Sequence, residues 1–148
     1  MKKILLPLIL LSLFCRVQAQ RYLTEVFDQV QMTPDIFYGQ ALSAEDTIAN
    51  LAMDIFEPVG DTEELRPLMV LVHGGSFVGG DRRDPLMMAV CETFAKKGYV
   101  TVTMTYRLGI DYGNFLNLGD ELSRATLRAV QDHNAAMRFF YKSARDEG

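Results

Sequence analysis

The central part of the sequence carries the clearest pattern of apolar and polar positions. Residues 67–72 (PLMVLV) form an apolar run that does not alternate with polar residues, as in a strand buried on both faces of a parallel sheet. Tyr99–Tyr106 is rich in β-branched and aromatic residues and predicts a second strand. Between them, Asp84 before Pro85 predicts an N-cap and a first helical residue. This helix should run to about Lys97, where Gly98 ends it.

A long amphipathic helix is predicted from about Leu122 to Lys142. Arginines, a glutamine and a lysine occupy one of its faces, which indicates that the opposite face is buried. The order strand, helix, strand, helix after residue 67 predicts an α/β sheet with parallel strands. The expected buried stripe consists of Leu122, Thr126, Ala129, His133, Ala136 and Phe140.

The preceding segment predicts two further strands. Tyr22–Gln31 alternates loosely and contains β-branched and aromatic residues, so we expect a strand there, followed by a turn over Pro34–Gly39. Alternation from Leu51 to Phe56 predicts another strand, which should end at Pro58. Gly60–Arg66 is charged and typical of a surface loop.

The first nineteen residues have the pattern of a secretory signal peptide. Lys2 and Lys3 precede an apolar run from Ile4 to Phe14, and small residues lead to a predicted cleavage site after Ala19. The run is shorter than the ~20 residues that a membrane anchor needs. We therefore expect a secreted or periplasmic protein whose mature form has no membrane span and whose single domain is residues 20–148.

Composition narrows the possible partners. The chain has 148 residues, a formal net charge of −4 and 49% hydrophobic residues, which is typical of a globular domain. It has no basic cluster, so we expect no binding to nucleic acid. Cys91 is the only cysteine after the predicted cleavage site, and its apolar neighbours favour a buried, inert thiol. Neither a metal site nor an organic cofactor is indicated.

The candidate chemistry lies in the glycine-rich segment 73–80 (HGGSFVGG) directly after the first predicted buried strand. Adjacent glycines let a backbone turn sharply and approach a ligand, so that main-chain N–H groups could stabilise a negatively charged oxygen. A structural turn or a phosphate-binding loop are alternatives. The phosphate-binding motif would require a Gly-Lys-Ser/Thr sequence, and the dinucleotide motif would require Gly-x-Gly-x-x-Gly; neither is present.

With these motifs the chain resembles the carboxylesterase and lipase branch of the α/β-hydrolases. The resemblance rests on the His-Gly-Gly-Ser-Phe loop, on Tyr106-Arg107-Leu108 after the next strand, on Asn50–Pro58, on Lys97–Val100 and on the Gln131–Phe139 part of the long helix. It implies the N-terminal part of an α/β-hydrolase sheet. The first strands would be antiparallel, the later strands parallel with flanking helices, and the chain would stop before the nucleophile strand.

The same resemblance assigns roles in the loop. An HGGG-type loop after the third strand supplies oxyanion-hole donors in this family, which would be the backbone N–H groups of Gly75 and Ser76. Gly74 would permit the turn, and His73 would support the loop from the end of the strand. Ser76 stands where many members have a third glycine.

The catalytic triad is absent from the sequence. The family nucleophile lies in Gly-x-Ser-x-Gly, and residues 74–78 (GGSFV) only approximate this motif, so Ser76 is not expected to be a nucleophile. His133 is interpreted as a packed core residue, and segment 81–84 (DRRD) as a solvated loop. The aspartates are expected in turns, caps and salt bridges: Asp54, Asp81, Asp84, Asp111 and Asp132.

These features predict the front part of a secreted serine esterase that forms an acyl-serine intermediate. Its substrate would be a small ester or an ester linked to a polysaccharide. The fragment itself is expected to be inactive and poorly soluble, because residues 68–72 would form an exposed apolar edge strand. The alternative is a non-catalytic α/β-hydrolase-like domain that serves in binding or adhesion. The sequence does not indicate an oligomeric state.

Overall fold

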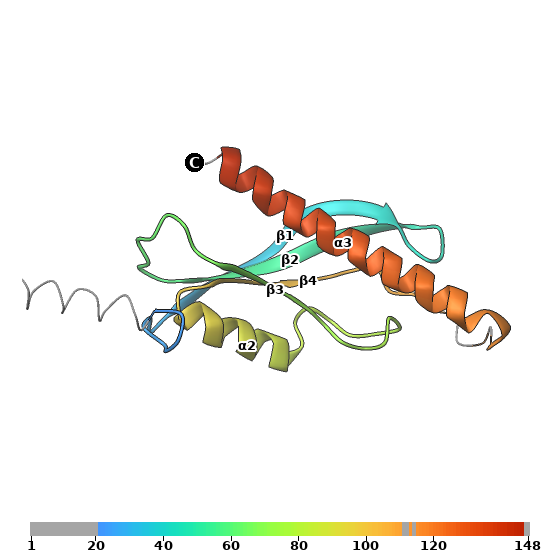
Figure 1. The fold of residues 1–148 in the computed structure, drawn as a ribbon, viewed down its shortest axis with the longest axis horizontal. Coiled ribbons are helices and arrows are strands. Elements are labelled where there is room, and N and C mark those ends of the chain that lie inside the picture. The colour runs from blue at the N-terminus through green and yellow to red at the C-terminus, as the bar shows by residue number, and fades with distance from the viewer. Residues whose placement is uncertain (1–20, 111–112, 114, 147–148) are drawn as a thin grey trace, which may run out of the picture.

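The computed structural model describes residues 21–110, 113 and 115–146. A four-stranded mixed sheet forms its centre, with strands β1 (Val30–Leu42), β2 (Ile48–Pro58), β3 (Leu68–Val72) and β4 (Val100–Met104). Their order across the sheet is β1-β2-β4-β3 (Figure 1). The pairs β1–β2 and β2–β4 are antiparallel, whereas β3 and β4 are parallel. This arrangement confirms the predicted α/β class with antiparallel first strands. The predicted signal peptide and Asp111 lie outside the described residues.

The first strand differs from the sequence prediction. β1 begins only at Val30 and continues through the predicted turn at residues 34–39, so both of those predictions are wrong. Its pairing with β2 shifts register between Thr33 and Ile36 and again between Phe37 and Gly39. Pro34 has no N–H for the sheet ladder, and a bulge on an edge strand accommodates it without ending the strand.

Residues 21–29 close the C-terminal end of helix α2 (Pro85–Lys96) instead of forming a strand. The N–H of Tyr22 donates to the carbonyl of Lys97, and the N–H groups of Val26 and Phe27 donate to Lys96. These carbonyls have no partners inside the helix, so the irregular segment 21–29 satisfies them. The aromatic residues that suggested a strand pack here, as the edge-on contact between Tyr22 and Tyr99 illustrates.

Helix α2 covers one face of the sheet. The side chain of Asp84 accepts hydrogen bonds from the N–H groups of Leu86 and Met87, which confirms the predicted N-cap. Cys91 and Ala95 are fully buried against Phe56 of β2. Burial raises the pKa of the Cys91 thiol, which makes the reactive thiolate less available and fits the predicted inert role.

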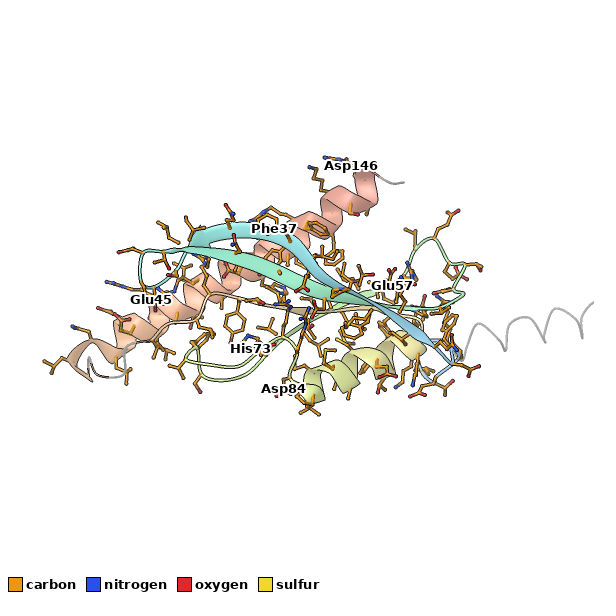
Figure 2. The ribbon with its side chains drawn as sticks, turned by 180° about the vertical axis from the view of Figure 1, so that it is seen from behind. Phe37, Glu45, Glu57, His73, Asp84 and Asp146 are labelled. Atoms are coloured by element: carbon orange, nitrogen blue, oxygen red, sulfur yellow. The ribbon has the colours of Figure 1, made fainter. Side chains whose placement is uncertain are left out.

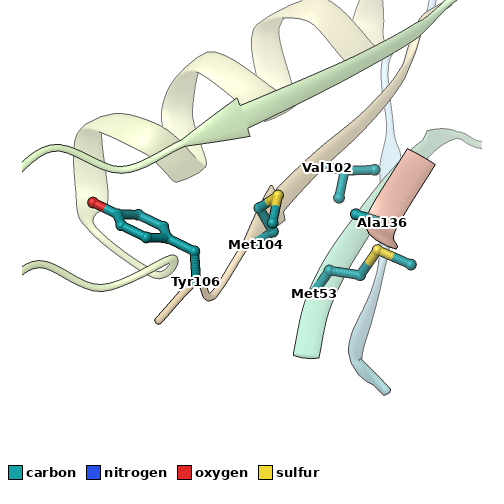
Figure 3. Close-up of a cluster of buried hydrophobic side chains, with 5 residues drawn as sticks. All are labelled: Met53, Val102, Met104, Tyr106 and Ala136. Carbon is teal, nitrogen blue, oxygen red and sulfur yellow. The ribbon is translucent and has the colours of Figure 1, made fainter. Parts of the chain in front are cut away.

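Helix α3 (Leu118–Asp146) follows a short 3₁₀ turn, η1 (Phe115–Asn117), and lies across the opposite face (Figure 1). Figure 3 shows how its Ala136 approaches Met53 and Val102, beside Met104 and Tyr106. A small residue at this point lets the helix lie close to the sheet. Every member of this cluster is at most 4% exposed.

The predicted stripe of α3 is only partly correct. Ala136 is buried, but Leu122 is 48% exposed and Thr126 is also exposed. The residues that are fully enclosed are Ala125, Asp132 and Ala136. Ala129 and Phe140 of the predicted stripe are partly buried and pack against the core, so the buried face overlaps the predicted one but is shifted toward Ala125 and Asp132. His133, predicted to be packed in the core, is only half-buried.

Strand β3 forms one edge of the described sheet and pairs there with β4 alone. Val72 at its end is 42% exposed. Within the described residues, no helix combines the length and apolar character needed to cross a membrane.

Candidate functional site

The glycine-rich loop, residues 73–80, leaves the carboxyl end of β3 and leads to the start of α2. In Figure 2, His73 lies on the sheet side of this loop and Asp84 marks where α2 begins. His73 is 5% exposed, whereas Gly74, Gly75 and Ser76 are exposed. The structure therefore places the predicted supporting residue inside and the predicted donor residues at the surface.

Tyr106, just beyond the end of β4, is the platform under the loop. Its ring stacks on the imidazole of His73 with centroids 4.5 Å apart. Its hydroxyl donates a 3.0 Å hydrogen bond to the carbonyl of His73. Burial raises the pKa of this phenol, which keeps the hydroxyl protonated as a donor. Tyr106 thus fixes both the side chain and the main chain of the residue from which the loop departs.

Phe77 anchors the far side of the loop. Its ring meets Tyr106 edge-on at 6.3 Å between centroids, and it packs against the core beneath α3. Its carbonyl accepts a 2.7 Å hydrogen bond from the N–H of Gly109, which follows β4. The loop is therefore held at its tip as well as at its base.

Three successive residues of the loop have positive φ angles: Gly75 (120°), Ser76 (52°) and Phe77 (64°). The sharp turn therefore begins at Gly75, and Gly74 is not in the left-handed region. The carbonyl of Gly75 accepts hydrogen bonds from the N–H groups of Val78 and Gly79, which close the loop on itself. Within the described part of the chain, no hydrogen bond involves the N–H of Gly75.

Two glycines of the loop are required by contact as well as by φ. A Cβ at Gly75 would overlap the carbonyl of Gly79, with the carbonyl carbon only 2.7 Å away. A Cβ at Gly80, whose φ is 103°, would overlap the His73 imidazole, with Cε1 only 2.9 Å away. Gly74 and Gly79 have open space at the corresponding position. The two ends of the loop thus cross closely above His73.

The segment after the loop, residues 81–84, is a turn in which Asp81, Arg83 and Asp84 are exposed, as the sequence suggested, but its two arginines also bind a buried carboxylate. Arg82 is only 15% exposed in its side chain, and its Nη1 donates a 2.8 Å hydrogen bond to Thr105. Arg83 donates from Nε to Asp54 at 2.7 Å. Asp54 is completely buried in β2. The sequence pattern did not reveal this pairing, because the partner carboxylate is supplied by a strand almost thirty residues earlier in the chain.

A second buried ion pair joins the end of β4 to α3. The carboxylate of Asp132 accepts hydrogen bonds from the main-chain N–H of Arg107 at 2.8 Å and from its Nε at 3.0 Å. Arg107 also donates to the carbonyl of Leu42 at the end of β1. This pair secures the segment that supplies Tyr106 and Gly109 to the loop. The expectation that Asp54, Asp84 and Asp132 form caps and salt bridges is confirmed.

A cavity of about 490 Å³ adjoins the loop at the end of the sheet where β4 finishes and β2 begins. Val78 of the loop and Tyr106 to Ile110 after β4 form one side, and the β1–β2 hairpin around Asn50 forms the other. A larger cavity of about 560 Å³ lies between Leu68, Val100 and the C-terminal part of α3, at the opposite end of β3. Only the first cavity borders the candidate loop. The described residues contain no group of three or more His, Cys, Asp or Glu side chains that could hold a metal ion.

Sequence reasoning found the loop but missed what holds it. Tyr106 was identified only as part of a motif after the strand, and Arg82 and Arg83 were assigned to solvent. The available signal was the position of Tyr106 at the end of a buried strand, where parallel strands collect functional side chains. No local signal identified Asp54 as the partner of the arginines.

Comparison with known proteins identifies the family and the fold of the chain. The sequence profile of the BD-FAE family matches residues 53–146, which is more than half of the chain. No curated protein sequence is significantly similar to the chain. Among solved structures, brefeldin A esterase, a bacterial homologue of human hormone sensitive lipase, superposes with a TM-score of 0.52 at 18% identity. This match covers 93% of the present chain and 36% of that esterase.

Esterase B from Lactobacillus rhamnosis also matches, with a TM-score of 0.47 at 20% identity over 89% of this chain and 36% of that one. The same esterase with a bound C6-C4 SN3 inhibitor gives 0.47 at 19% identity, over 89% and 37% of the respective chains. The chain thus spans little more than a third of the length of these solved esterases. The likeness to brefeldin A esterase establishes the fold.

Proposed function

The chain belongs to the BD-FAE family of esterase-like α/β-hydrolases, and from this we propose that the complete protein is a secreted serine esterase. In this proposal a serine outside the present chain attacks the ester carbonyl and forms an acyl-serine intermediate. The present chain supplies the loop that stabilises the negative charge on the carbonyl oxygen. The donors are the main-chain N–H groups of Gly75 and Ser76.

The observation that carries this proposal is the shape of the loop at the carboxyl end of a parallel strand. A backbone in the left-handed region at three successive residues turns its peptide units abruptly, and the next residue, Val78, lines a cavity. Tyr106, His73 and Phe77 hold the loop from below, so its dipoles need little reorganisation when charge develops. A loop held in this way is better suited to stabilising a transition state than to making a flexible contact.

The substrate is proposed to be a carboxylic ester of a small acyl group or of a polysaccharide side group. The cavity beside Val78 and Tyr106 would receive part of it, because it opens at the same sheet edge as the loop. The reaction needs a serine, a base and an acid from other parts of the protein, so residues 20–148 alone should not turn over p-nitrophenyl acetate.

The donor assignment is tested on the complete protein by two changes at one position. Replacing the peptide bond between Gly75 and Ser76 by an ester removes the Ser76 N–H and also weakens the Gly75 carbonyl as an acceptor for Val78 and Gly79. In this variant kcat for p-nitrophenyl acetate should fall by about 10² to 10³. Ser76→Ala keeps the N–H and should leave kcat within about twofold, since a hydroxyl is not required there. An unchanged kcat in the ester variant refutes the donor role. Loss of activity in Ser76→Ala would instead show that the Ser76 side chain is needed, as a nucleophile or for the loop conformation.

A Gly75→Pro variant also removes a donor, but proline cannot adopt the φ of 120° at this position. It therefore tests loop conformation together with donation, and the change at Ser76 is the cleaner experiment. Absence of esterase activity in the complete wild-type protein would favour a non-catalytic binding or adhesion domain.

Secretion is a separate part of the proposal. The basic start, the apolar run and the small residues before Ala19 support cleavage at that point. Mass spectrometry of the protein from the secreted or periplasmic fraction should give an N-terminus at Gln20. Recovery only as an intact chain beginning at Met1 would refute it.

A further inference from the structure

Asp54 is the only acidic residue on β2 whose side chain is completely enclosed, and it lies near the exit of the glycine-rich loop. Its Oδ2 is 2.7 Å from Nε of Arg83 and 3.2 Å from Nε of Arg82. Its Oδ1 accepts hydrogen bonds from the main-chain N–H of Asp35 at 2.8 Å and from Nη2 of Arg83 at 3.1 Å. One carboxylate therefore binds the main chain of β1 and both arginines of the segment after the loop.

The two arginines are fixed on their outer side as well. Both form ion pairs with the carboxylate of Asp35, and Arg82 also donates to the hydroxyl of Thr105 at the end of β4. Asp35 lies in the bulge of β1 with a φ of 57°, so its N–H points at Asp54 instead of joining the ladder. The bulge and the buried carboxylate together form a socket for the two arginines.

This socket acts on the loop through a very short connection. Gly80 lies two residues before Arg82. It is so close to His73 and to the carbonyl of Gly74 that an added Cβ would overlap them. Asp84, one residue after Arg83, caps α2. The loop therefore has a fixed entry at His73 and a fixed exit at the arginines. Without the exit, the crossing of Gly75 and Gly79 would depend on the two hydrogen bonds to the Gly75 carbonyl and on the anchoring of Phe77.

We propose that Asp54 is a positioning residue for the glycine-rich loop and, through Arg82 and Arg83, sets the placement of the Gly75 and Ser76 amides. Its catalytic consequence rests on the proposed esterase function. A displacement of reacting groups by about 1 Å can reduce a rate by about 10². Asp54 itself is buried beneath the loop and touches no substrate in this proposal.

The experiment compares Asp54→Asn with Asp61→Asn in the complete protein. Asp61 is a matched control, because its side chain is also only 2% exposed and also pairs with an arginine, Arg21, but far from the loop. The first readout is hydrogen exchange at the amides of Val78 and Gly79, which bond to the carbonyl of Gly75. The second is kcat and KM for p-nitrophenyl acetate.

Asp54→Asn should accelerate exchange at these two amides by about tenfold and leave α3 protected as in the wild type, because the opening is local. It should lower kcat by about tenfold to a hundredfold with KM within about twofold. Asp61→Asn should change neither the loop amides nor kcat. If Asp54→Asn does not fold, Arg83→Met, which leaves Arg82 beside the carboxylate, should give the same pattern in weaker form.

Several results would overturn the proposal. Unchanged exchange at Val78 and Gly79 in folded Asp54→Asn contradicts it directly. A uniform acceleration over the whole sheet, or an equal loss of kcat in Asp61→Asn, would show that burial of charge serves stability alone. If the wild-type protein has no esterase activity, the proposed function fails, while the exchange measurement still decides whether Asp54 positions the loop.

Discussion

The carboxylate of Asp132 on α3 contacts Arg107 at two points. It accepts a hydrogen bond from the main-chain N–H at 2.8 Å and forms an ion pair with the side-chain Nη2 at 2.8 Å. Both side chains are at least nine-tenths buried. Removing one partner of such a pair leaves an uncompensated charge in the interior, which costs about 3–5 kcal/mol. Asp132→Ala should therefore lower the free energy of unfolding by about that amount in a urea titration.

The control for this prediction is Asp146→Ala. Asp146 also pairs with an arginine, Arg145, but both side chains are largely exposed. Its removal should change the free energy of unfolding by less than about 1 kcal/mol. Equal effects of the two substitutions would mean that the buried pair contributes no more than a surface pair.

Tyr106→Phe should loosen the base of the glycine-rich loop without emptying the core. The phenylalanine ring keeps the stacking on His73 but loses the hydrogen bond to the His73 carbonyl, which is then left without this donor. We expect a loss of about 1–3 kcal/mol in stability. Tyr141→Phe, at a tyrosine that is 74% exposed, should have no measurable effect. Equal melting temperatures for Tyr106→Phe and the wild type would show that this hydrogen bond is dispensable.

The four glycines of the loop should respond in two pairs. Gly75→Ala and Gly80→Ala introduce a Cβ into the loop backbone or into His73, at positive φ angles. Gly74→Ala and Gly79→Ala meet open space. In the complete enzyme the first pair should lower kcat by about tenfold or more, because the loop must shift. The second pair should leave kcat within about twofold. A loss of activity as large in Gly74→Ala would contradict the observed loop conformation.

The parts of the fold that were predicted correctly are those that neighbouring residues specify. The apolar run of β3, the Asp84-Pro85 start of α2 and the β-branched residues of β4 each act within a few positions. The first strand failed because residues 21–29 satisfy the carbonyls at the end of α2, about seventy positions later. A local pattern of aromatic residues does not distinguish these two outcomes.

The same division holds for the candidate site. The glycines indicate the loop in the sequence, because the backbone passes so close to itself at Gly75 and Gly80 that a Cβ would overlap neighbouring atoms. Its supports come from elsewhere: Asp54 from β2 and Tyr106 from beyond β4. Their pairing depends on strand order and on the bulge at Asp35, which spacing along the chain does not reveal. For this reason a segment of four charged residues was interpreted as solvated although its arginines bind a buried carboxylate.

Acid should destabilise the chain through Asp54 and Asp61. Burial alone would raise the pKa of each carboxyl, but hydrogen bonds and charge from their arginines outweigh it and lower both below the usual 3.8. Their stabilising contribution is therefore complete above the unfolded-state pKa and is lost as the pH falls through the lower folded-state values. The free energy of unfolding should be level from pH 7 to about 5 and fall steeply below about 4. Asp54→Asn should flatten this fall, and an unaltered slope would exclude Asp54 as a contributor.

Strand β3 should make residues 20–148 prone to self-association when they are produced alone. Its outer edge pairs with no strand of the described sheet, and an unpaired apolar edge can join a second copy. Val72→Lys places a charge at a residue that is already 42% exposed, so it should reduce association without removing a core side chain. Leu116→Lys adds the same charge at a 98% exposed residue away from this edge and should not help. Sedimentation of the three proteins at equal concentration checks this, and a monodisperse wild-type chain that melts cooperatively would contradict it.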